Sequence, residues 1–134
     1  ENIKNLSKEL QLNNNIIFLK NIDQDLKNAL ISKSNVFVMP SIIHKTSVEG
    51  FGISYVEAAQ YGIPSIGGVD GGASDAIKHN ETGLICDGKN LNDIYSSIDL
   101  ILKNNSYLQL GKKAKEYSLN FHWEKIVKDY LKVL

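Results

Sequence analysis

Arginine is absent from this 134-residue sequence, because all fifteen of its basic residues are lysine. The absence argues against the bidentate arginine–phosphate pairs on which many phosphate sites rely. An excess of charge is also missing, since fifteen acidic residues balance the lysines. No net field would attract nucleic acid or an anionic membrane surface, and the lysines are not interleaved with aromatic residues. We therefore expect no nucleic-acid partner.

Cysteine occurs once, at Cys86, so no internal disulfide is possible and a reducing compartment is expected. No apolar run comes close to the length of about 18 residues that a membrane-spanning helix needs, and the sequence does not begin with a signal peptide. These absences predict a cytoplasmic protein. The sequence starts at Glu1 rather than at a methionine, and a helical pattern begins at once. We therefore interpret residues 1–134 as one domain of a larger protein.

Several kinds of catalytic site are missing from the sequence. His44, His79 and His122 lie far apart and lack ligand partners at helical spacing, so no metal site is expected. No nucleophile elbow and no Walker loop occur, which argues against a serine hydrolase and a nucleoside triphosphatase. The glycine-rich stretch from Gly67 to Gly72 could cradle an anion or could only form a tight turn, and both interpretations stay open here.

Short apolar runs alternate with helical patterns, which predicts parallel strands joined by crossover helices. The predicted strands are residues 16–19, 36–39, 63–66 and 84–86. The predicted helices are residues 2–12, 53–61 and 73–78, one capped by Asp23 that ends near 34–35, and three later ones that begin after Asn90, near Ser106 and after Trp123.

The segment around which the chain is organised holds two carboxylates, Glu49 and Glu57, eight positions apart with Gly50 and Gly52 between them. Glycines at such positions let the backbone approach a ligand closely. The carboxylates are suited to accept hydrogen bonds from the hydroxyl groups of a sugar. The competing interpretation is that Glu57 faces solvent on its helix, Glu49 is a loop charge and the glycines only shape a turn.

A short helix is predicted to follow these glycines, from about Ile53 to Tyr61. Gly62 would be its left-handed stop, and Pro64 would prevent its continuation. The free N–H groups at the start of this helix would point toward the glycines. Such a helix N-terminus favours an anion. A sugar that carries a phosphate would therefore suit both the carboxylates and the helix start.

The segment Glu49-Gly-Phe-Gly-Ile-Ser-Tyr-Val-Glu57-Ala-Ala closely resembles the Glu-x7-Glu region of retaining GT-B glycosyltransferases of family 4. Flanking motifs extend the resemblance over nearly the whole chain, in the family's order and spacing: Val36–Ser41, Gly62–Ile66, Asp75–Ile77, Thr82–Ile85 and Phe121–Trp123. The resemblance implies an α/β fold, a Rossmann-like parallel sheet flanked by helices. This would be the C-terminal half of a GT-B fold without its first strands.

The resemblance also implies roles for single residues. Glu57 would accept hydrogen bonds from the ribose of the nucleotide, and Glu49 would be the catalytic residue beside the donor sugar. Phe51, Gly52 and Ile53 would donate backbone N–H groups to the sugar and the diphosphate. Gly50, which precedes them, would also belong to the donor-binding loop.

Three further positions complete the implied donor site. Leu19 and Lys20 fall where such enzymes contact the base. Lys45 lies in a segment longer than in many family members, so it could reach a phosphate or be a solvated loop charge. The basic pair that usually grips the diphosphate has no counterpart in this sequence.

The implied activity is the retaining, metal-independent transfer of a hexose or N-acetylhexosamine from a nucleotide sugar, a UDP-sugar by preference. A composition rich in Asn, Ile and Lys is similar to that of bacterial surface-polysaccharide enzymes, which suggests a lipid-linked O-antigen or capsule acceptor at the inner face of the membrane. A separate N-terminal domain would hold the acceptor, so residues 1–134 alone would bind the donor without turnover. The alternatives are a non-catalytic nucleotide-binding or assembly domain and, less favoured, half of a nucleotide-sugar 2-epimerase.

Overall fold

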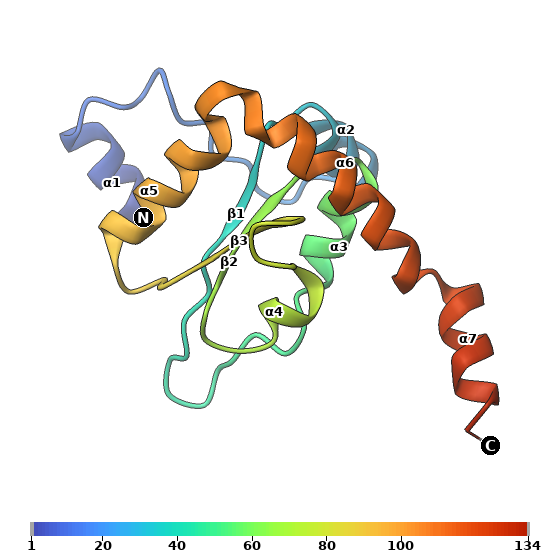
Figure 1. Cartoon of the computed structure of the whole chain (residues 1–134). Coiled ribbons are helices and arrows are strands. Elements are labelled where there is room, and N and C mark those ends of the chain that lie inside the picture. The colour runs from blue at the N-terminus through green and yellow to red at the C-terminus, as the bar shows by residue number, and fades with distance from the viewer. Residues whose placement is uncertain (1, 134) are drawn as a thin grey trace.

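A three-stranded parallel sheet forms the centre of the chain in the computed structural model, which describes residues 2–133 (Figure 1). Its strands are β1 (Phe37–Met39), β2 (Ser65–Gly68) and β3 (Gly83–Cys86), in the order β1-β2-β3. Ser65 lies opposite both Phe37 and Gly83, and both strand pairs are parallel. The predicted α/β class with parallel strands is confirmed.

Helices cover both faces of this sheet, and two of them begin at the caps that the sequence predicts. Asp23 accepts a hydrogen bond from the Leu26 N–H at 2.7 Å, and Asn90 accepts from the N–H groups of Asn92 and Asp93. The helices are α1 (Asn2–Glu9), α2 (Gln24–Ser32), α3 (Ile53–Gln60), α4 (Ala73–Ala76), α5 (Leu91–Leu102), α6 (Ser106–Ser118) and α7 (Trp123–Leu131), with short 3₁₀ turns η1 (Lys103–Asn105) and η2 (Leu119–Phe121).

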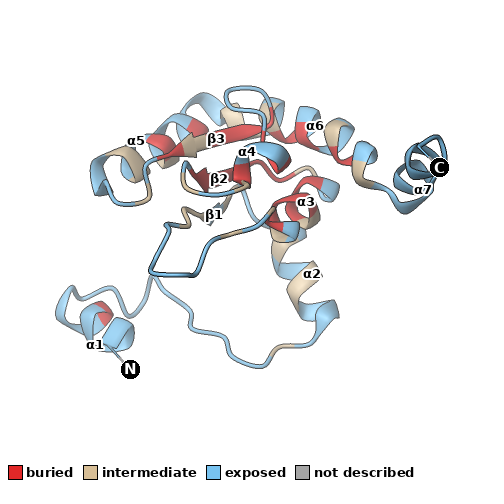
Figure 2. Cartoon of the chain, turned by 90° about the horizontal axis from the view of Figure 1, so that it is seen from below, coloured by how far each residue is buried: buried red, intermediate tan, exposed pale blue. Residues whose placement is uncertain are grey.

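The core consists of two clusters, one on each face of the sheet. Side chains alternate between the faces along a strand, so β3 contributes Leu84 and Cys86 to one cluster and Ile85 to the other. The cluster that includes Ile85 packs α3 and α4 on one face of the sheet, and the cluster that includes Leu84 and Cys86 packs α5 and the start of α6 on the other (Figure 2). Cys86 is a buried core residue, as predicted.

The strand predicted at Ile16–Leu19 is wrong. These residues belong to a long connection between α1 and α2 that runs outside the sheet (Figure 2), and Ile17 is 84% exposed. A strand needs a neighbour with which to exchange backbone hydrogen bonds, and this run pairs with no strand among residues 2–133. The preceding helix is also shorter than predicted, because Gln11 has a left-handed φ of 57°.

The boundary predicted between the third strand and the glycine-rich loop is also wrong. β2 begins at Ser65, two residues later than predicted, and it includes Gly67 and Gly68. A Cβ on Gly68 would lie 1.9 Å from the Ser41 carbonyl oxygen, so glycine is what allows β2 to pass so close to that backbone. The helix predicted at 73–78 ends at Ala76, because Ile77 is extended.

The last helix, α7, projects from the body of the molecule (Figure 1) and contributes no buried residue. Its apolar stripe is largely exposed, with Tyr130 and Leu131 each more than 60% accessible. In the sequence, apolar residues at helical spacing predict a stripe on this helix, Ile126, Val127, Tyr130, Leu131 and Leu134, of which Leu134 lies outside the described residues. No helix among residues 2–133 has the length and apolar character needed to cross a bilayer.

Candidate functional site

The loop through Glu49 and Gly50 enters α3 at Gly52, as the sequence predicts. Gly52 has φ 82° and ψ 63°, and a Cβ there would lie 2.3 Å from the Tyr55 ring. No other residue fits this N-terminal cap without strain. At the far end, Gly62 has φ 75° and donates its N–H to the Ala59 carbonyl at 2.8 Å, which confirms the predicted stop.

Tyr55 anchors the first turn of α3 to the sheet. Its side chain is 1% exposed, and its hydroxyl donates to the Met39 carbonyl at the end of β1 at 2.6 Å. Burial raises the pKa of Tyr55, and the negative charge of Glu49 raises it further. The Glu49 carboxylate therefore lies within electrostatic reach of the anchor that fixes the helix start.

The glycine-rich loop lies directly against the Glu49 loop. The Gly72 N–H donates to the Glu49 carbonyl at 2.9 Å. A Cβ on Gly72 would lie 1.8 Å from the Gly50 carbonyl oxygen, and one on Gly71 would lie 2.5 Å from that of Glu49. These glycines thus permit two backbones to touch, which supports the structural interpretation of the loop. Anion binding by this loop, the other alternative, is not tested.

Glu57, one turn further along α3, forms an ion pair that the sequence does not predict. Its Oε1 accepts a hydrogen bond from the Lys27 ammonium on α2 at 2.9 Å. The two side chains are 31% and 35% exposed, so Glu57 is neither free in solvent nor fully buried. Lys27 lies 30 positions upstream on another helix, and no local pattern in the sequence signals such a pairing.

Asp70, in the glycine-rich loop, holds the segment between β1 and Glu49. Its Oδ2 accepts hydrogen bonds from the Ile43 N–H at 3.1 Å and from the Lys89 ammonium at 2.8 Å. The bond from Lys89 lowers the pKa of Asp70. Sequence reasoning missed this residue, although Asp70 is the one acid within the glycine-rich stretch.

The structure brings together six of the nine predicted site residues and leaves the other three separate. Glu49, Glu57 and the four residues Gly50, Phe51, Gly52 and Ile53 belong to one loop-and-helix unit. Leu19 and Lys20 lie in the exposed connection before α2, and Lys45 lies in an exposed turn closed by hydrogen bonds between His44 and Ser47. No hydrogen bond or ion pair among residues 2–133 joins these three side chains to that unit.

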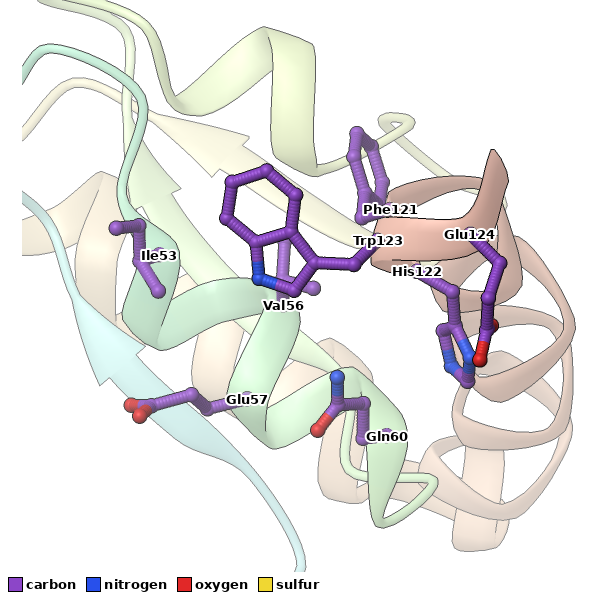
Figure 3. Close-up of a pocket in the computed structure, with 8 residues that line it drawn as sticks. All are labelled: Ile53, Val56, Glu57, Gln60, Phe121, His122, Trp123 and Glu124. Carbon is purple, nitrogen blue, oxygen red and sulfur yellow. The ribbon is translucent and has the colours of Figure 1, made fainter. Parts of the chain in front are cut away.

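A hollow of about 420 Å³ opens beside α3, between Ile53, Val56, Glu57 and Gln60 on one side and Phe121 to Glu124 on the other (Figure 3). Phe51 contacts Phe121 edge-to-face, with ring centroids 5.4 Å apart, which joins the site loop to the segment before α7. In Figure 3 the Glu57 carboxylate points away from Trp123, toward the opposite side of the helix.

No group of three or more His, Cys, Asp or Glu side chains within residues 2–133 is arranged to hold a metal ion. His79 instead accepts a hydrogen bond at Nδ1 from the Ile85 N–H of β3 at 2.9 Å, which gives that backbone donor a partner. Within residues 2–133, the hydrogen bonds of His44 are those that its backbone exchanges with Ser47.

Curated relatives match nearly the whole chain. A mannosyltransferase of Mycobacterium tuberculosis, described as GDP-mannose-dependent alpha-(1-6)-phosphatidylinositol monomannoside mannosyltransferase, is 27% identical over 92% of this chain and 33% of its own length. N-acetyl-alpha-D-glucosaminyl L-malate synthase of Bacillus anthracis is 30% identical over 96% of this chain and 32% of its own length. The chain thus spans about a third of the length of the curated relatives it matches.

Solved structures match the fold. Sucrose-phosphate synthase of Thermosynechococcus elongatus superposes with a TM-score of 0.85 at 29% identity, over 98% of this chain and 32% of that one. The Anabaena protein HepE, solved with UDP and glucose, gives a TM-score of 0.80 at 19% identity, over 99% of this chain and 36% of that one. The sheet and its helices match the C-terminal half of such GT-B glycosyltransferases. The model of the family described as glycosyl transferases group 1 matches residues 1–118, and the chain belongs to that family.

Proposed function

We propose that residues 1–134 are the donor-binding domain of a retaining, metal-independent glycosyltransferase of family 4. The observation that carries the proposal is the loop-and-helix unit, in which Gly52 opens α3 between two carboxylates. Glu57 accepts hydrogen bonds from the ribose, and Glu49 lies beside the donor sugar as the catalytic residue. The free N–H groups at the start of α3, near Phe51 and Ile53, bind the diphosphate.

Charge development explains why this arrangement suits sugar transfer. When the bond to the donor sugar breaks, the leaving nucleoside diphosphate gains negative charge. Fixed N–H dipoles at the start of a helix stabilise that charge without reorganising. Tyr55 keeps this helix start in place through the hydrogen bond from its hydroxyl to the Met39 carbonyl. We propose that the site uses these dipoles where other enzymes use a metal ion.

The donor in this proposal is a UDP-activated hexose or N-acetylhexosamine, and the acceptor is a lipid-linked surface glycan such as an O-antigen unit. An N-terminal domain of the complete enzyme holds the acceptor, and the reaction takes place at the cytoplasmic face of the membrane. Relatives named for a phosphatidylinositol mannoside and for a dolichol-linked glycan support a lipid-linked acceptor. HepE, solved with UDP-glucose, supports a UDP donor, whereas the mannosyltransferases are named for GDP-mannose. Leu19 and Lys20 contact the base, and Lys45 is assigned to the phosphates.

The complete enzyme tests the catalytic role of Glu49. Glu49→Ala should lower kcat about 100-fold while it weakens UDP binding much less, because the carboxylate acts on the reacting sugar rather than on the nucleotide. The matched control is Glu81→Ala, an exposed acid outside the site. Equal losses in kcat and in UDP affinity would reduce Glu49 to a binding residue. No sugar transfer by the unmodified enzyme would instead support a non-catalytic domain.

A further inference from the structure

The ion pair between Lys27 and Glu57 uses the same carboxylate to which the proposed function assigns the ribose. It joins α2 to α3 at 2.9 Å across 30 residues of sequence. α2 contributes no buried side chain, so this contact is a tether between a lightly packed helix and the site. Ion pairs with this much exposure contribute little to global stability, so substitution of Lys27 should leave the fold intact.

One half of the Glu57 carboxylate stays available. A carboxylate has about four acceptor sites on its two oxygens. Lys27 uses Oε1, and Oε2 accepts no hydrogen bond from any residue in the described part of the chain. The vicinal hydroxyls of a ribose need acceptors of this kind, so the pair leaves room for the ligand.

A lysine beside Glu57 favours nucleotide binding in two ways, through its charge and by restricting the glutamate side chain. A nucleoside diphosphate is anionic, and an unpaired Glu57 would repel it. The Lys27 ammonium offsets that repulsion. It also restricts a glutamate side chain whose rotamers would otherwise have to be ordered on binding, which is preorganisation of the site.

We propose that Lys27 is a positioning residue for donor binding, which holds Oε1 of Glu57 so that Oε2 receives the ribose hydroxyls of the nucleotide. This role rests on the proposed function, because it presupposes a ribose at Glu57. It makes α2 part of the donor site, although none of the motifs in the sequence includes this helix.

The test is a titration of the chain with UDP and with 2′,3′-dideoxy-UDP, which lacks both ribose hydroxyls. Lys27→Met should weaken UDP binding about 3- to 10-fold, the loss expected when one charge-assisted contact is misplaced. It should weaken the binding of the dideoxy nucleotide less, because only the offset of the Glu57 charge is lost there and no ribose hydroxyl is misplaced. Lys27→Arg should restore most of the UDP affinity, because it keeps the charge and the donors. Lys33→Met, which removes an exposed lysine at the end of the same helix, is the matched control.

The outcomes separate the role of Lys27 from the proposed function. UDP affinity that is unchanged or tighter in Lys27→Met overturns the positioning role, as does an equal loss for both nucleotides, which would assign Lys27 to the phosphates. If Lys27→Met fails to fold by circular dichroism, Lys27→Gln replaces it, and the comparison with Lys27→Arg decides in the same way. Failure of Glu57→Ala to weaken UDP binding would overturn the proposed function itself, whatever Lys27 does.

Discussion

At the scale of single residues, Tyr55 decides whether the start of α3 stays in place. Tyr55→Phe removes the hydroxyl that donates to the Met39 carbonyl at 2.6 Å, whereas that carbonyl keeps its hydrogen bond from the Ser41 N–H. We expect the free energy of unfolding to fall by about 0.5–1.5 kcal/mol, measured by urea denaturation. Tyr95→Phe, at a 71% exposed position, is the control and should change stability little. An equal effect of both substitutions would contradict the anchoring role.

The same tyrosine predicts how stability depends on pH. Burial, and then the charge of Glu49, raise the pKa of Tyr55 above its ordinary value of 10.0. A folded-state pKa above the unfolded value means that the folded chain keeps this proton when the unfolded chain loses it. The stabilising contribution is therefore complete below pH 10.0 and is lost as pH rises further. Tyr55→Phe should flatten this decline in unfolding free energy, and a slope identical to that of the unmodified chain would contradict the assignment.

Residues differ in how far the sequence reveals them. The entry into α3 at Gly52 was predictable because the spacing and helix signals of that local segment are visible in the sequence, whereas the ligand-binding roles of Glu49 and Glu57 stay predictions. Lys27 was not predictable, because its partner lies 30 positions away on another helix. The bond from Tyr55 to Met39 crosses 16 positions between a helix and a strand, which a local pattern does not encode either.

At the scale of elements, the entry into α3 offers a matched pair of glycines. Gly52→Ala forces a side chain into a left-handed conformation and against the Tyr55 ring, so we expect a loss of about 1–3 kcal/mol in unfolding free energy. A Cβ on Gly50 would meet nothing within 4 Å, so Gly50→Ala should be nearly neutral for stability. Thermal and urea denaturation of the two variants check this difference, and equal stabilities would contradict the described cap.

Element boundaries were predicted well where local chemistry sets them. The caps at Asp23 and Asn90 and the stop at Gly62 depend on neighbouring residues, and the structure confirms all three. The strand predicted at residues 16–19 depended on a partner strand that a local apolar run does not specify. The extent of β2 depended on the distant Ser41 backbone, which lies against Gly68.

At the scale of the whole molecule, the chain is a packed sheet with a projecting helix. Because α7 buries no residue, a chain ending at His122 should keep its thermal unfolding midpoint within about 3 °C of that of the unmodified chain. It should also keep its nucleotide affinity. Phe121 is retained in this truncation, since it packs on Phe51 and Tyr117. A chain that loses cooperative unfolding after this truncation would show that α7 is part of the core.

The fold class of the whole molecule was predictable because a chain of alternating strands and helices can pack in only a few topologies. The same order favours the site proposed at the start of α3, since ligands of open α/β sheets bind at the carboxyl ends of the strands, and this location stays a prediction. The ion pair that links α2 to this site was not predictable, because it exists only after both helices pack.

The most direct measurement of the central claim is an NMR titration of the chain with UDP, GDP and ADP, followed at the amides from Phe51 to Glu57. We predict shifts with UDP at nucleotide concentrations on the order of millimolar, and a loss of affinity of about 10-fold or more in Glu57→Ala. Glu81→Ala should leave the shifts unchanged. Shifts with GDP alone would mean that the donor is a GDP-sugar rather than a UDP-sugar, and the location of the site would stand. Silence with all three nucleotides, or shifts that survive Glu57→Ala, would contradict the account of a ribose bound at this helix.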